Sequence, residues 1–340
     1  MKSVAGNLLI ASAGLLVLGL ISSTIGPAAM DVGALVGSFF GSATLTPTQQ
    51  AIFWELRLPR VVAASLVGIS LAVAGVAFQG LFRNSLAEPY IIGASSGAAL
   101  GVAIAVVFGL QGTFFGLSIM SGCALASTLA SVTLVLAIGA LVDRTSTLSL
   151  LLVGVVVSSL ISAVVSLMMF LNDQKAVVIL SWLMGSLAGS NWNTVIMTAV
   201  LGTMGVAIIA LMARALDAYS LGDTASQSLG LNLRWFCVAL IAGASLATAA
   251  AVASSGIVGF VGLIAPHIGR RLVGANHSRL IPISGCLGAG LMIVADTIAR
   301  TTVAPAELPV GIVTAILGCP FLLALLISRH RGHHAPGGLR

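Results

Sequence analysis

The sequence predicts an all-α polytopic membrane protein with about ten transmembrane helices, a fold class indicated by its composition and by the length of its apolar runs. Of its 340 residues, 58% are hydrophobic and only 7% are charged. The mean hydropathy is +1.13. Such a chain has too few charged residues to cover the surface of a soluble protein, and it is too apolar to be disordered, so both classes are excluded.

Ten apolar segments account for most of the chain. The first follows Met1 and Lys2 and could be mistaken for a signal peptide, but its apolar run is long for one and no A-x-A cleavage site follows it cleanly. We therefore expect a retained first helix. The eighth segment is too short to cross a bilayer alone. The segments lie at 7–26, 58–82, 91–110, 116–142, 148–171, 192–213, 235–255, 260–273, 280–300 and 309–328.

The chain is predicted to form one membrane domain over residues 1–340, with two connecting segments longer than a turn needs. Segment 27–56 is expected to form an outer loop that is long enough for a short surface helix. Segment 214–234 is polar and is punctuated by glycines, which predicts one short helix across the cytoplasmic face; a solvated connector is the alternative. Residues 329–340 are expected to be a cytoplasmic tail, more typical of positive-inside sequence than of a metal or haem site.

The distribution of basic residues predicts the orientation. With the N-terminus in the cytoplasm, the inner side holds eleven Lys and Arg residues and the outer side holds four. Because cytoplasmic loops carry an excess of basic residues, both termini are predicted to lie in the cytoplasm and the protein in the plasma (inner) membrane. The net charge of +6 reflects this bias, and too few aromatic residues lie beside basic ones to predict binding of nucleic acid.

Motifs for catalysis and metal binding are missing from the sequence. It contains no G-x-x-x-x-G-K-[ST], no H-E-x-x-H and no C-x-x-C motif, so we expect no cofactor, no metal site and no enzymatic activity. A mid-membrane carboxylate, which ion-coupled carriers use, is also missing. Asp296 lies near an outer end and has Arg300 four residues later on the same helix face. Energy for transport is therefore expected to come from a separate subunit, with an ion-coupled carrier as the alternative class.

Several runs of residues, in their order and spacing, carry a specific resemblance. They are RLPR at 57–60, QGLFRNSLAEP at 79–89, GASSG at 93–97, GIVGFVGLIAPH at 256–267, ADTIAR at 295–300 and ELPVG at 307–311. With these runs the chain resembles the FecCD family of ABC importer permeases, the family of the vitamin B12 importer's membrane subunit. The resemblance covers about residues 50–328.

The resemblance implies a ten-helix permease that pairs with a second copy as a homodimer, with the pathway between the copies. It also implies a dimer of cytoplasmic ABC ATPase subunits, an extracytoplasmic substrate-binding protein and a surrounding lipid membrane as partners. The cargo it implies is an iron chelate, either a siderophore or haem, with cobalamin as the second choice. The sequence does not distinguish a homodimer from a pair of paralogues.

Two sets of residues acquire roles outside the cytoplasm from the resemblance. Arg57, Arg60 and Arg300 are expected to dock the binding protein, because opposite charges at a wet interface steer and orient a partner. Anchoring to lipid headgroups, with Arg300 paired to Asp296, is the alternative. Met168, Met169 and Phe170 are expected to line the pathway, and lipid-facing packing is the alternative.

Two further sets acquire cytoplasmic roles. The expected inner gate consists of the loop between the second and third apolar segments and the turn that opens the fifth. Ordinary tight turns between helices are the alternative. Ser85, in the first of these loops, stands where the family usually has proline. The coupling segment is expected to fit the ATPase, with Asp223 and Gln227 one helical turn apart. The gate residues are Asn84, Ser85, Leu86, Thr147 and Leu148, and the coupling residues are Leu221, Gly222, Asp223, Gln227 and Gly230.

Overall fold

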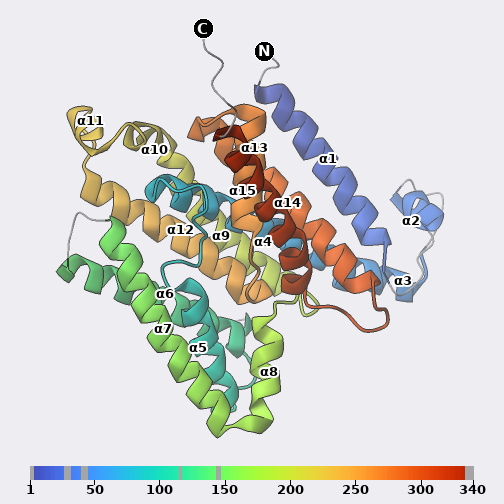
Figure 1. Cartoon of the computed structure of the whole chain (residues 1–340). Coiled ribbons are helices and arrows are strands. Elements are labelled where there is room, and N and C mark those ends of the chain that lie inside the picture. Colours follow the sequence, from blue (N-terminus) through green and yellow to red (C-terminus); the bar gives the residue numbers. More distant parts are fainter. Residues whose placement is uncertain (1–3, 27–31, 40–44, 115–116, 143–146, 334–340) are drawn as a thin grey trace.

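The computed structural model describes residues 4–26, 32–39, 45–114, 117–142 and 147–333, which fold into one bundle of helices (Figure 1). Each of the ten predicted segments overlaps one long or apolar helix. These ten helices are α1 (Val4–Thr24), α4 (Leu58–Leu81), α5 (Ala94–Val107), α6 (Ile119–Val142), α7 (Thr147–Leu171), α9 (Trp192–Leu211), α12 (Leu233–Ser255), α13 (Val261–Val273), α14 (His277–Thr301) and α15 (Val310–His333).

Six of the helices in the described residues are long and apolar enough to cross a membrane. They are the helices α4, α6, α7, α9, α12 and α14, and α4 is continuous with the helical turns before it. Helix α5 has 14 residues, and α13 has only 13, as the sequence predicted for the eighth segment. The predicted all-α polytopic membrane fold is confirmed; the strands β1 (Thr113–Phe114) and β2 (Leu117–Ser118) form only a minimal hairpin.

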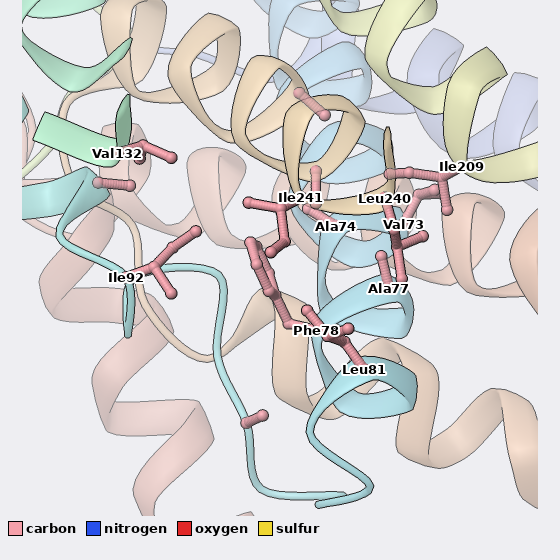
Figure 2. Packing of buried hydrophobic residues seen from close by; sticks show 14 of the residues in the cluster. Val73, Ala74, Ala77, Phe78, Leu81, Ile92, Val132, Ile209, Leu240 and Ile241 are labelled. Atoms are coloured by element: carbon pink, nitrogen blue, oxygen red, sulfur yellow. The ribbon is translucent and has the colours of Figure 1, made fainter. Parts of the chain in front are cut away.

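Helix α4 lies at the centre of the bundle, where it packs against α14, α12, α9 and α13. Its buried side chains meet Leu240 and Ile241 of α12 and Ile209 of α9 (Figure 2). Glycines allow the closest approaches: a Cβ on Gly68 would collide with the backbone of Gly288 in α14. Small residues let membrane helices approach in this way, because lipid is as apolar as the side chains that it would replace.

The connection between α4 and α5 is hydrogen-bonded to the connection between α12 and α13. Tyr90, after α4, donates its hydroxyl to the carbonyl of Val258 at 2.8 Å and accepts the Val258 N–H at 3.2 Å. Glu88 accepts the N–H of Phe260, which begins α13 with a left-handed φ of 69°. Irregular backbone inside a membrane bundle needs such internal partners, because lipid offers none.

The segment at 214–234 differs from its prediction. In place of one short helix the structure has two, α10 (Ala213–Tyr219) and α11 (Asp223–Ser228). They are separated at Gly222, whose φ of 107° is a conformation that L side chains rarely adopt. Gly222 therefore divides the segment into two short helices.

Helices also occur where the sequence predicted connections. Segment 27–56, predicted to be long enough for a short surface helix, contains α2 (Val32–Phe39), α3 (Pro47–Ala51) and the start of the π-helix η1 (Ile52–Arg57), which runs into α4. Thr46 and Gln49 form a reciprocal capping box at the start of α3. Helix α8 (Asp173–Leu183), between α7 and α9, was not predicted.

Candidate functional site

One end of the bundle holds a buried cluster of charges around Arg60 of α4. Its guanidinium donates to both carboxylate oxygens of Asp296 in α14, with Nη2 2.8 Å from Oδ1 and Nε 3.0 Å from Oδ2. Its Nη1 lies 2.9 Å from Oε1 of Glu307, in the connection to α15. Arg60 is 9% exposed and Asp296 is 1% exposed. This forked geometry joins three separate segments through charge-assisted hydrogen bonds.

The other two arginines expected to dock a partner bind the end of α1. Arg300 donates to the carbonyl and to the hydroxyl of Ser22, both at 2.6 Å, and its Nε lies 3.8 Å from Asp296. Arg57 donates to the carbonyl of Thr24 at 2.7 Å. Cations stabilise the carboxyl-terminal end of a helix, where carbonyl groups lack partners.

All three arginines are therefore buried, at what we call the arginine end of the bundle. Each of the three guanidinium groups is occupied by partners within the chain. The expected pair of Arg300 with Asp296 is present, but Arg60 is the nearer partner. Three guanidinium groups face two carboxylates here, so the cluster retains an excess of positive charge.

Helices α10 and α11 lie at the opposite end of the bundle, the α10–α11 end (Figure 1). Leu216 and Tyr219 of α10 are buried in the core. Asp217 accepts the backbone N–H of His277 at 2.9 Å and lies 2.6 Å from its Nδ1, so α10 is tied to the first turn of α14.

The predicted coupling residues, in and beside α11, differ in their exposure. Leu221 and Gln227 are exposed, as is Gly230 beyond the helix, and Gly222 is half-buried. Asp223 does not simply face outward beside Gln227: its Oδ1 lies 2.6 Å from Nη2 of Arg83. Arg83 was not among the predicted site residues, because nothing in its spacing indicated a partner 140 positions away.

The predicted gate loop begins directly after Arg83. The N–H of Asn84 donates to the carbonyl of Gln79 at 3.1 Å, and the Asn84 side chain accepts the N–H of Leu86 at 2.9 Å. This side-chain turn replaces the rigidity that proline would give at Ser85. The other predicted gate residues, Thr147 and Leu148, are the first two residues of α7, after 143–146, which lie outside the described residues.

Helix α7 contains no Asp, Glu, Lys or Arg, and most of its large apolar side chains are exposed. Of the three predicted lining residues, Phe170 is 82% exposed, whereas Met168 and Met169 are partly buried and pack against the core. The exposed face of this helix requires a lipid or protein neighbour, because an apolar surface of this size is not left in water.

The family to which this polytopic bundle belongs gives the class of the protein. It is the membrane-spanning permease subunit of an ABC importer, and it is not itself the catalytic subunit. The chain belongs to the FecCD transport family, whose model matches residues 14–328.

Relatives align along nearly the whole chain. The hemin transport system permease protein HmuU of Yersinia pestis is 38% identical over 93% of this chain and 95% of its own length. The molybdate import system permease protein MolB of Haemophilus influenzae is 37% identical over 94% of both. A solved structure described as an inward-facing conformation of a metal-chelate type ABC transporter has a TM-score of 0.82 and 34% identity, and it covers 95% of this chain and 99% of the other.

Membership of this family decides between the two energy sources considered for transport, a separate ATPase subunit and an ion gradient. A permease of this class works with an ATPase and a binding protein, so the ion-coupled carrier is not supported. The protein is a multi-pass membrane protein.

Proposed function

We propose that this permease carries an iron chelate, either haem or a siderophore complex, across the plasma membrane. The observation that supports this cargo most directly is the charge-free, apolar face of α7, the helix expected to line the pathway. A large chelate with apolar edges can slide past such a wall without being held by it. The full-length similarity to a haemin permease agrees with this cargo.

Two other cargoes are candidates. Cobalamin is also a large metal chelate and would pass the same wall. Molybdate is the cargo named for a relative of nearly equal identity, but it is a small dianion. A dianion needs cationic side chains or N–H donors where it loses its water, and α7 supplies no charged residue.

We also propose how the subunit is assembled and oriented. The arginine end faces the binding protein outside, and its excess positive charge attracts acidic residues of that protein, for which Arg57, Arg60 and Arg300 then exchange partners. The α10–α11 end faces an ATPase dimer in the cytoplasm, where both termini lie. The exposed face of α7 packs against a second copy of the chain, so that Phe170 of each copy faces the pathway. Residues 1–340 act as one permease domain, with Asn84, Ser85, Leu86, Thr147 and Leu148 as its inner gate.

A transport assay tests the cargo. The chain would be co-purified with its P-loop ATPase, reconstituted in liposomes with the binding protein, and given haemin, a ferric hydroxamate, cyanocobalamin or molybdate. We expect ATP-dependent uptake of haemin or of the hydroxamate. Uptake of cyanocobalamin or molybdate alone would refute the iron-chelate assignment while leaving the importer class intact.

A further inference from the structure

The side chain of Arg83 bridges two segments that the proposed function treats separately. It follows the last turn of α4 and precedes the gate loop, and its Nη2 lies 2.6 Å from Oδ1 of Asp223 at the start of α11. The same Nη2 donates to the carbonyl of Tyr219, the last residue of α10, at 2.7 Å. The guanidinium carbon also lies 4.1 Å from the centre of the Tyr219 ring. One side chain thus contacts both short helices.

The backbone at Arg83 is also specialised. Its φ of 48° is left-handed, which is uncommon for a residue other than glycine. Such a conformation persists only where the surroundings hold it, and it tends to occur at functional positions. Here it turns the chain from α4 into the gate loop, and the next residue, Asn84, immediately bonds back to Gln79. The direction in which the gate loop leaves α4 is therefore set at Arg83.

The contacts of Arg83 contribute little to folding. Its side chain is 40% exposed and that of Asp223 is 53% exposed, and ion pairs this open to water add at most a small stabilisation. Anchoring of α10 is already provided by the buried Leu216 and Tyr219 and by the bonds from Asp217 to His277. The bundle does not need Arg83 to hold α10 in place.

We propose that Arg83 is a positioning residue that transmits movement of α11 to the gate loop. This inference rests on the proposed roles of those two segments. When the ATPase displaces α11, Asp223 moves with it, and the guanidinium pulls the first residue of the gate loop in the same direction. Arginine suits this role because its planar group can bond to a carboxylate and a carbonyl while it stacks on an aromatic ring. The path through Arg83 is short, and it connects α11 and the gate loop, which can each move.

The test compares variants that remove the contact between Arg83 and Asp223 with a variant that alters the contact between Asp217 of α10 and His277 of α14. In the complex with ATPase and binding protein, Arg83→Gln is expected to leave ATP hydrolysis near the wild-type rate but to lower haemin transported per ATP about threefold to tenfold. Asp223→Asn is expected to lower the same ratio. Asp217→Asn is the matched control: it alters a carboxylate of α10 whose hydrogen bonds lead to α14, so the ratio is expected to stay within twofold of wild type. The charge swap Arg83→Asp with Asp223→Arg is expected to restore part of the ratio.

A second readout does not depend on the cargo. Ser85→Cys would be labelled with a hydrophilic maleimide before and after trapping the complex with ATP and vanadate, and the chain without this substitution measures labelling of the four native cysteines. We expect trapping to change labelling at position 85 in the Ser85→Cys chain but not after Arg83→Gln is added. Unchanged transport per ATP together with an unchanged labelling response in Arg83→Gln would overturn the inference. If the unmodified complex instead takes up only another cargo, the iron-chelate proposal fails, and the labelling result still decides the role of Arg83.

Discussion

We expect most of the Asp296→Ala variant to unfold when the membrane is solubilised in detergent. Asp296 is 1% exposed and accepts hydrogen bonds from Nε and Nη2 of Arg60, with Arg300 3.8 Å away. Removing one partner of a buried ion pair leaves an uncompensated charge and typically costs about 3–5 kcal/mol. That is a large part of the stability of most proteins. The midpoint of thermal unfolding, followed by size-exclusion chromatography in mild detergent, should therefore fall well below that of the wild type.

Two further variants separate the charge from the side-chain volume. Glu307→Gln alters the second carboxylate partner of Arg60. Because the Glu307 side chain is 30% exposed, this variant should lower the midpoint of thermal unfolding much less than Asp296→Ala does. Combining Asp296→Leu with Arg60→Met removes both charges of the central pair and should be less destabilising than Asp296→Ala alone, because an apolar pair of similar volume avoids the buried charge. An Asp296→Ala variant as stable as the wild type would show that the cluster does not hold α4 to α14.

The helices could be predicted from the sequence because membrane helices carry a signal that is local. A segment that crosses a bilayer must be apolar over its whole length and must satisfy its own backbone, so 58–82 and 280–300 are visible as runs of residues. The shortness of 260–273 was visible for the same reason and is confirmed by α13. Helix α8 was missed because its first turn is polar and its length is only 11 residues.

The contacts of the site could not be predicted, because they join positions that are far apart in the chain. Spacing alone offered Arg300 as the partner of Asp296, whereas the structure places Arg60, 236 positions away, at 2.8 Å. Arg83 was likewise visible only as one charge in a loop, although the family-like run around it was recognised. Composition also cannot distinguish a solvated arginine from one buried against carbonyl groups, so the burial of Arg57 was not foreseen.

The variant Gly288→Ala is expected to force α4 and α14 apart. A Cβ on Gly288 would collide with the carbonyl oxygen of Gly68 and would lie 2.5 Å from the Cβ of Ala72. Both obstacles belong to the helix at the centre of the bundle, and neither is the end of a flexible side chain, so the backbone must shift. Overfilling a packed contact costs about 1–3 kcal/mol. The midpoint of thermal unfolding and the rate of transport should both fall, since α14 carries Asp296 towards one end and His277 at the other.

Gly285 provides the matched control, because it lies about one turn earlier on the same helix. A Cβ there would meet only the side chains of Ile69 and Val73, the nearest at 3.5 Å, which is an ordinary contact. Replacing glycine by alanine gains up to about 1 kcal/mol of helix propensity at either position, so the difference between the two variants isolates the contact with α4. We expect Gly285→Ala to unfold at or slightly above the wild-type temperature. If Gly288→Ala did the same, α4 and α14 would have room for the extra methyl group, and the glycine contacts would not be what limits the approach of these two helices.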